Sequence, residues 1–311
     1  MEVMTIVVTF PGQGSQKPGF LAEWLERPES RSTLERLADA SGVDLVAHGT
    51  ESDADTIRDT AIAQPLIVAA GILSWDALAE RLGERLDGVT VAGHSVGEIA
   101  AAYAAGIFDA ETAIRFVARR ANLMAEDAAK HTTSMSAVIG GDEADVVARL
   151  TELALEPANY NGAGQIVAAG EPDALEALKA EPVAGTRVIP LKVAGAFHTR
   201  YMADAHDALA ASADEFAVSD PVRPILTNFD GTAVTSGADY RQLLVDQVNR
   251  PVRWDRCMAN FVESGVTGLI EAAPAGTLTG LAKRAMRGTE LINLNAPNDL
   301  DAAVALFDSA N

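Results

Sequence analysis

The chain has 311 residues, enough for one large domain or for a domain that carries a smaller insert. Its formal net charge is −20, which argues against nucleic acid or an anionic membrane as the general partner, because overall repulsion would have to be overcome locally. Cys257 is the only cysteine, so neither a disulfide within the chain nor a thiolate zinc site is possible, and a reducing interior is expected.

The start of the chain does not have the pattern of a secretory leader. Residues 1–5 contain no lysine or arginine, and the run Thr5–Phe10 is too short for the apolar region of a signal peptide. No uninterrupted apolar run approaches the roughly 18 residues that a membrane span needs. We therefore expect a cytoplasmic protein.

Thr5–Phe10 is predicted to be a buried strand, because it is rich in β-branched residues and is followed by Pro11-Gly12. The next loop lacks the Gly-Lys-Ser/Thr of a phosphate-binding loop, and Lys17 stands where a dinucleotide fingerprint has its third glycine. Flexible loops at the carboxyl ends of strands line the ligand crevice of open α/β sheets. Gln13 is therefore a candidate ligand contact, although a loop glutamine is more often structural.

A candidate nucleophile lies in the next part of the chain. Helical patterns come first, over about Phe20–Leu25, Ser32–Ser41 and Ala63–Gly83. Gly93-His94-Ser95-Val96-Gly97 then joins a short β-branched run, Val89-Thr90-Val91, to a helical run from Glu98 to Ala105. Such a sharp strand-to-helix turn presents a serine hydroxyl, here that of Ser95, in nucleophile elbows. A Gly-x-Ser-x-Gly pattern also arises by chance in roughly one such chain in ten, so the interpretation depends on the strand before it and the helix after it.

The next predicted helix, about Ala110–Lys130, contains an arginine outside its polar face. That face is formed by Arg115, Arg119, Asn122 and Glu126. Arg120 falls on the apolar side, between Phe116 and Leu123. A snorkelling arginine at the seam is the more common arrangement. The alternative is a partly buried guanidinium that binds a carboxylate through two hydrogen bonds.

From Met135 the pattern changes to short elements in the order βαββαβ. The strand-like runs are Met135–Ile139, Pro157–Asn161, Gln165–Ala169 and Arg187–Val193, and the helical runs are Asp142–Leu155 and Glu171–Lys179. This order is the ferredoxin-like pattern. We therefore predict a large α/β domain of residues 1–130 and 198–311, an inserted small domain of residues 131–197, and a cleft between them.

The rest of the chain continues the alternation of helices and strands. We predict a helix over Tyr201–Phe216, a strand over Pro224–Thr227, a helix from Trp254, a strand over Val266–Glu271 and a basic helix at Lys283–Arg287. Alternation of this kind predicts an α/β fold with a mostly parallel sheet.

A serine needs an adjacent base to attack at neutral pH, and histidine has a suitable pKa. Four of the five histidines lie beside Ser95 in the chain, in polar segments or within a predicted helix: His94, His48, His131 and His206. His198 follows Gly195-Ala196-Phe197 at a predicted strand–helix junction. This position makes His198 the best candidate for the base.

Several motifs share one order along the chain: Phe10–Gln16, Gly93–Glu98, Arg120 with Met124, Asn159–Gln165, Gly195–His198, Gln247–Pro251 and Leu278–Leu281. In this combination the chain resembles the malonyl-CoA:acyl carrier protein transacylases of fatty-acid synthesis, whose superfamily includes the acyltransferase domains of polyketide synthases. Each motif is weak alone, but the series is specific and covers nearly the whole chain. This sequence departs from the family pattern at Val96, where leucine is usual, and at Ala273 and Ala275, where glycines are common before the Leu278–Leu281 motif.

The resemblance implies a hydrolase-like α/β core with a ferredoxin-like insert. It also implies that Ser95 is the nucleophile, that His198 is the general base and later the acid, and that the main-chain carbonyl of Gln247 orients His198. Gln13 would position the thioester, beside an oxyanion hole formed by its own backbone N–H and that of Val96.

The resemblance further implies the substrates. Arg120 would bind the free carboxylate that distinguishes malonyl from acetyl, and Phe197 would crowd the space of an α-methyl group. Malonyl-CoA and acyl carrier protein would be the partners, and no metal or redox cofactor is implied. Because carrier proteins are acidic, a local basic patch is expected on this acidic chain, formed by Lys283, Arg284 and Arg287, with Arg119. The protein would act as a monomer.

Three alternatives remain open. An esterase or lipase-like hydrolase shares the elbow but has no need of Arg120. The same acyl transfer also occurs in other pathways, such as polyketide assembly or malonate decarboxylation. A carrier-binding protein without activity is disfavoured, because Ser95 and His198 are both present.

Overall fold

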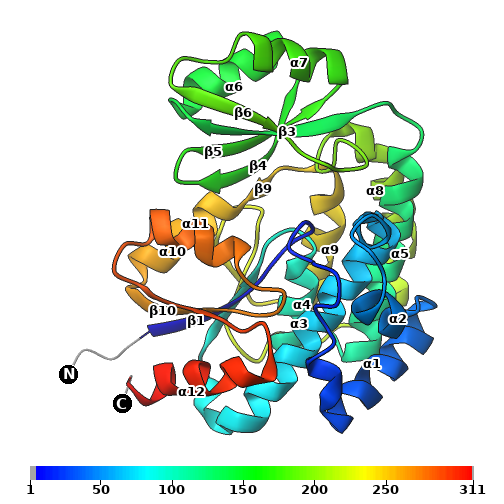
Figure 1. Ribbon diagram of the computed structural model, residues 1–311, viewed down its shortest axis with the longest axis vertical. Helices are drawn as coiled ribbons and strands as arrows, with labels where there is room; N and C mark the ends of the chain where they lie inside the picture. The colour runs from blue at the N-terminus through cyan, green and yellow to red at the C-terminus, as the bar shows by residue number, and fades with distance from the viewer. Residues whose placement is uncertain (1–4, 310–311) are drawn as a thin grey trace.

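The computed structural model describes residues 5–309 and is a mixed α/β fold with two sheets (Figure 1). Residues 1–4, on which part of the leader prediction rests, and residues 310–311 lie outside the described part. The larger sheet has the strand order β11-β10-β1-β2-β7-β8. Its strands are β1 (Thr5–Phe10), β2 (Thr90–Gly93), β7 (Ile225–Leu226), β8 (Ala233–Val234), β10 (Val266–Glu271) and β11 (Glu290–Asn293).

This sheet is parallel from β11 to β7, and only β8 is antiparallel to its neighbour. The mostly parallel sheet expected from the sequence is therefore confirmed, and β1 and β10 begin and end where predicted. Around the sheet lie α1 (Pro28–Ser41), α2 (Leu45–Thr50), α3 (Thr60–Leu82), α4 (Gly97–Ala104), α5 (Ala110–Ala128), α8 (Ala203–Ser212), α9 (Gly237–Asp246), α10 (Trp254–Glu263), α11 (Thr277–Ala285) and α12 (Leu300–Asp308).

Helices cover both faces of the larger sheet, as the side chains of β1 show: successive residues pack into different cores. Val7 packs with residues of α10 and α11, whereas Ile6, Val8 and Phe10 belong to the core that includes α3, α4 and α5. Side chains of a strand alternate between the two faces of its sheet, so a strand with continuous apolar character indicates burial on both faces. Val7 and Val8 are fully buried.

Helix α3 is the central helix of this core. The segment Thr60–Leu86 is long and apolar enough to cross a membrane by length and composition, yet 83% of its most apolar window is buried inside the protein. The helix packs most extensively against α5 and α4. A helix that is apolar on all sides is typical of the centre of a large core as well as of a membrane span.

The smaller sheet has the strand order β6-β3-β5-β4-β9. Its elements are β3 (Ser134–Gly140), α6 (Glu143–Glu152), β4 (Glu156–Gly162), β5 (Gln165–Gly170), α7 (Pro172–Ala180), β6 (Thr186–Pro190) and β9 (Val252–Arg253). The helices α6 and α7 lie together at the end of the molecule farthest from α12 (Figure 1). They and the sheet enclose a separate small core that includes Val138, Leu150 and Leu178.

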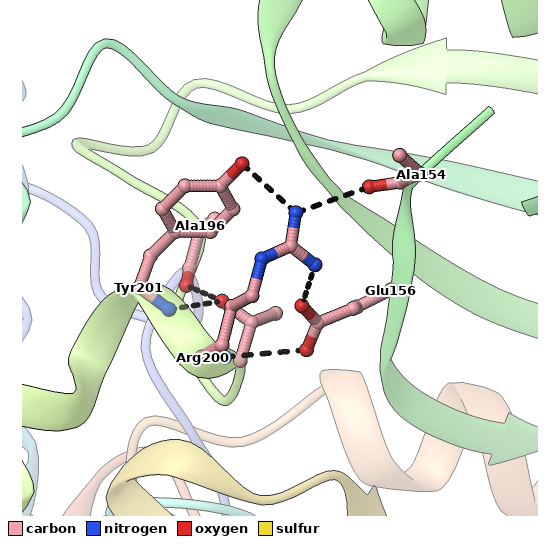
Figure 2. Close-up of polar contacts among 6 residues, drawn as sticks. Ala154, Glu156, Ala196, Arg200 and Tyr201 are labelled. Atoms are coloured by element: carbon pink, nitrogen blue, oxygen red, sulfur yellow. Dashed lines mark hydrogen bonds and ion pairs between the residues drawn. The ribbon is translucent and has the colours of Figure 1, made fainter. Parts of the chain in front are cut away.

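Several contacts join the smaller sheet to the rest of the chain, among them a strand pairing and an ion pair. Strand β9, which comes from the C-terminal part of the sequence, pairs parallel with β4, with Val252 opposite Asn159. In addition, the Arg200 guanidinium forms an ion pair with Glu156 on β4 and donates to the Tyr201 hydroxyl at 3.1 Å (Figure 2). The Arg200 backbone N–H also donates to Glu156 Oε2 at 3.2 Å.

Some local predictions were wrong. The predicted helix at Phe20–Leu25 is a set of turns with one 3-10 turn at Trp24–Glu26, and the Leu21 N–H donates to the Gly49 carbonyl at 3.1 Å. Helix α1 begins at Pro28, four residues before the predicted start at Ser32; the fixed φ of proline suits the first helical position. Helix α2 was not predicted, since six residues are too few for an apolar period.

Candidate active site

Ser95 lies in a sharp turn between β2 and α4, and its φ is 54°. This left-handed conformation is uncommon for residues other than glycine and is maintained only where the surroundings enforce it. A Cβ at Gly93 would lie 2.0 Å from the carbonyl carbon of Gly97, and a Cβ at Gly97 would lie 2.1 Å from the Phe10 carbonyl oxygen. The two glycines of the motif are therefore required by close backbone packing, as in a nucleophile elbow.

The Ser95 hydroxyl and the His198 ring form a buried pair, with 2.7 Å between Ser95 Oγ and His198 Nε2. His198 Nδ1 lies 2.8 Å from the main-chain carbonyl oxygen of Gln247. Because a carbonyl only accepts, Nδ1 carries the hydrogen and Nε2 is left to accept the Ser95 proton. Of the five histidines, His198 is the one that contacts Ser95 Oγ.

The surroundings of His198 favour the neutral imidazole. Burial, followed by the charge of Arg120, lowers the pKa of His198 to about 3, and the hydrogen bond to Gln247 opposes this only in part. The ring is therefore uncharged at neutral pH and able to take a proton from Ser95.

Arg120 on α5 is 1% exposed and donates two hydrogen bonds to glutamine side chains. Its Nη1 lies 2.6 Å from Gln64 Oε1, and its Nη2 lies 3.0 Å from Gln247 Oε1. Burial lowers the pKa of Arg120 to about 10, which leaves it charged at neutral pH. A guanidinium can present two parallel donors, which match the geometry of a carboxylate.

Gln13 belongs to the same hydrogen-bonded chain as Arg120. Gln64 Nε2 donates to Gln13 Oε1 at 3.4 Å, and Gln13 Nε2 donates to Thr60 Oγ1 at 3.3 Å. Val96 is fully buried and lies directly before the first residue of α4. Helix N-termini present backbone N–H groups and favour negative charge. Gln13 thus follows β1 in the chain, and Val96 lies between Ser95 and the first residue of α4.

A cavity of about 460 Å³ lies between the two sheets and contains Ser95 and His198. Gln13, Gln64 and Phe197 line it on the side of the larger sheet. Arg120 is not among the described residues that line the cavity, but it bonds to Gln64, which is. Side chains from the smaller sheet, such as Val167 on β5, form the opposite wall.

Three basic residues also line this cavity: Arg58, Lys192 and Arg284. The cavity is therefore suited to a ligand with an acidic part. Among residues 5–309 there is no group of three or more His, Cys, Asp or Glu side chains placed to hold a metal ion.

The predicted basic patch is only partly assembled. Lys283 and Arg284 are exposed in the last turn of α11, and Arg287 is exposed just beyond it. Arg284 Nη2 donates to Gln165 Oε1 at 2.9 Å, across to the smaller sheet. Arg119 lies on α5, on the other side of the larger sheet from α11 (Figure 1).

Sequence reasoning missed two residues that hold the Ser95 turn. Asn228 Oδ1 accepts the Ser95 N–H at 2.8 Å, and Asn228 Nδ2 donates to the Gly93 carbonyl at 2.7 Å. Glu98 Oε1 accepts the Asn228 N–H at 2.6 Å. A possible signal was present in each case: Glu98 ends the elbow motif, and Asn228 directly follows a predicted strand.

Comparison with known proteins places these features in a family. The pattern of the acyl transferase domain family matches residues 7–300. A malonyl CoA-acyl carrier protein transacylase of Mycobacterium tuberculosis is 48% identical over 95% of this chain and 98% of its own length. The corresponding protein of Escherichia coli K12 is 33% identical over 96% of this chain and 98% of its own length.

Solved structures agree with these matches. A crystal structure from Mycobacterium tuberculosis, at 48% identity, covers 96% of this chain and 99% of its own with a TM-score of 0.92. A malonyl-transacylase in complex with a type II polyketide-synthase acyl-carrier protein is 32% identical, covers 97% of this chain and 99% of its own, and has a TM-score of 0.90. The chain therefore belongs to the acyl transferase domain family and is similar along nearly its full length to malonyl CoA-acyl carrier protein transacylases.

Proposed function

We propose that this protein transfers the malonyl group from malonyl-CoA to the phosphopantetheine thiol of an acyl carrier protein, through a malonyl ester on Ser95. The observation that carries the proposal is the 2.7 Å contact between Ser95 Oγ and His198 Nε2 at the cavity. Both substrates follow from the names of the similar proteins, which are malonyl CoA-acyl carrier protein transacylases.

In the first half-reaction, Ser95 Oγ attacks the thioester carbonyl while its proton moves to His198 Nε2. The carbon–sulfur bond then breaks, and the CoA sulfur leaves with the proton from His198. In the second half-reaction, the carrier thiol gives its proton to His198 and attacks the serine ester, and Ser95 Oγ leaves with that proton. The backbone N–H groups of Gln13 and Val96 would stabilise the oxyanion of both steps.

Selectivity for malonyl would come from Arg120. Its two donors now bond to the amide oxygens of Gln64 and Gln247. A carboxylate would replace neutral amide acceptors with a charged one, and the guanidinium fork can bind its two oxygens through two parallel hydrogen bonds. Phe197, which lines the cavity, would crowd a substituent on the α-carbon. An esterase has no use for this buried cation.

The carrier protein would dock beside α11. Lys283, Arg284 and Arg287 are exposed there, and Arg284 also lines the cavity. The remote position of Arg119 leaves it out of this proposal. Reversing the charges of these three residues should raise the KM for the carrier protein by at least about tenfold and leave the KM for malonyl-CoA unchanged. An unchanged KM for the carrier would exclude this surface.

The fold fits a finer description that we also propose: a hydrolase-like core, residues 1–130 and 198–311, with a ferredoxin-like small domain at 131–197. The strand order β6-β3-β5-β4, with α6 and α7 in the crossovers, supports the ferredoxin-like part. We further propose that the protein works in the cytoplasm as a monomer, with fatty-acid synthesis as its pathway. A polyketide carrier is the second candidate, because a similar malonyl-transacylase was solved with one.

Mass spectrometry of the protein mixed with malonyl-CoA tests the function. A malonyl adduct should form on the wild type and be absent from Ser95→Ala. The Arg120→Ala variant separates a transacylase from a hydrolase: a transacylase should lose its preference for malonyl-CoA over acetyl-CoA, whereas a hydrolase should be indifferent. Absence of any adduct on the wild type would overturn the proposal.

A further inference from the structure

Glu98 is a buried carboxylate, 1% exposed, for which the proposed reaction has no step. Its Oε1 accepts the Asn228 N–H at 2.6 Å and the Tyr240 hydroxyl at 3.4 Å, and its Oε2 accepts from Gln247 Nε2. Each of these partners donates, so the carboxylate ends every hydrogen-bonded chain that reaches it. Burial raises the pKa of Glu98, and the donors and the charge of Arg120 lower it. Each oxygen faces an N–H donor, that of Asn228 or that of Gln247, and this geometry fits the charged carboxylate.

One chain from Glu98 leads to the nucleophile. The Asn228 backbone is fixed by Glu98, and its side chain spans the elbow, from the Ser95 N–H at 2.8 Å to the Gly93 carbonyl at 2.7 Å. A residue at φ 54° keeps this conformation only under such constraint. The position of Ser95 Oγ therefore depends on a side chain that Glu98 holds.

The other chain leads to the base. Gln247 lies between Arg120, which can only donate, and Glu98, which in its charged form can only accept. These two ends fix the orientation of the Gln247 amide. Its main-chain carbonyl is the group that orients His198, at 2.8 Å from Nδ1. Gln247 Nε2 also lies 3.2 Å from Asn228 Oδ1, so the two chains meet.

We propose that Glu98 is a positioning residue for acyl transfer: it holds Asn228 against the Ser95 turn and Gln247 against His198. The inference rests on the proposed function, because it concerns the same serine–histidine pair. A glutamine at this position would fill the same space but would place an NH₂ group against the Asn228 N–H or the Gln247 amide, donor against donor. An aspartate would keep two acceptor oxygens but would leave a gap.

The isosteric and the charge-conserving variants therefore separate the two possible roles. We would measure the rate constant and KM of Ser95 malonylation by rapid quench and mass spectrometry for the wild type, Glu98→Gln and Glu98→Asp. Asp76→Asn on α3 is a control, because Asp76 is a partly buried carboxylate that also has a tyrosine partner, the Tyr103 hydroxyl at 2.6 Å. Near-UV circular dichroism would report folding.

Glu98→Gln should lower the rate constant about 100-fold with KM within about threefold of wild type, the size of effect expected when a reacting group is misplaced by about 1 Å. Glu98→Asp should lie between wild type and Glu98→Gln, and Asp76→Asn should match wild type. A wild-type rate for Glu98→Gln would overturn the proposal. A lower rate constant for Glu98→Asp than for Glu98→Gln would also overturn it, because that order indicates that Glu98 only fills space.

If Glu98→Gln does not fold, Asn228→Ala tests the chain to Ser95 by the same measurement. A loss of similar size supports the proposal, and a wild-type rate overturns it. Failure of the wild type to form the adduct would instead show that the proposed function is wrong, and the role of Glu98 in that function would be wrong as well. If the wild type forms the adduct and Glu98→Gln forms it equally fast, only the inference about Glu98 is wrong and the proposed function stands.

Discussion

Arg120 and His198 are electrostatically coupled: burial lowers the pKa of the imidazole, and the guanidinium charge lowers it further, to about 3. The same guanidinium bonds to the side chain of Gln247, whose main-chain carbonyl holds His198 Nδ1. One cation thus serves a proposed substrate site and also adds to the effect of burial in keeping the base unprotonated. This relationship has direct consequences for the pH dependence of the reaction.

The rate of Ser95 malonylation should not fall on the acid side until the pH is well below 5. In the free protein, kcat/KM for malonyl-CoA reports the pKa of the essential base, and His198 stays neutral down to about pH 3. The measurement is kcat/KM from pH 5 to 8 by adduct formation. A decrease centred near pH 6.5, the ordinary pKa of histidine, would contradict this assignment.

The free energy of unfolding should decrease as the pH is lowered, because His198 takes up a proton more readily in the unfolded chain. His198 has a pKa of about 3 when folded and the ordinary value of about 6.5 when unfolded, so the unfolded chain binds the extra proton between these values. Its contribution is fully present above about pH 6.5 and is lost as the pH falls toward 3, at most about 1.4 kcal/mol per pH unit. Urea unfolding at pH 7 and pH 5 should show a larger loss for wild type than for His198→Asn. Equal losses would count against a depressed pKa.

Gly93→Ala should destabilise the protein strongly. Its Cβ would lie 2.0 Å from a backbone carbon of Gly97, so the elbow would have to open, and a loss of at least about 3 kcal/mol in the free energy of unfolding is expected. Gly280→Ala is the control, because a Cβ at that helical position meets no atom within 4 Å. This variant should be neutral or more stable by up to about 1 kcal/mol. Similar denaturation midpoints for the two variants would show that the elbow is more tolerant than its geometry indicates.

Arg120→Lys should not rescue malonyl transfer. Lysine keeps the charge but presents a single ammonium in place of two parallel donors, and it cannot bond to Gln64 and Gln247 in the same geometry. We expect kcat/KM for malonyl-CoA to fall at least about tenfold, with little change for acetyl-CoA. Full activity of Arg120→Lys would mean that charge alone suffices.

The parts of the site that could be predicted from sequence are those with a local signature. Ser95 was found because strand, turn and helix adjoin it in the chain, and His198 because it follows a predicted strand. The placement of Arg120 on the apolar face was also visible from the helical period, although its partners were not. Its role needed the family resemblance.

The missing parts depend on contacts between distant segments. Asn228 lies 133 residues from Ser95 and Gln64 lies 56 residues from Arg120, and no periodic pattern relates such positions. Strand β9 has two residues, too few for any alternation of polar and apolar side chains. Its place in the smaller sheet is set by pairing with β4 and not by its own sequence.

The pairing of β9 with β4 also limits how this protein can be recombined with its relatives. A chimera that exchanges residues 131–197 alone would bring in a foreign β4 and set it against the native Val252–Arg253 edge, three residues beyond the 3-10 turn Gln247–Asn249. A mismatch there would be passed to the carbonyl that orients His198. A chimera should therefore exchange the segment from Gln247 to Arg253 together with the small domain.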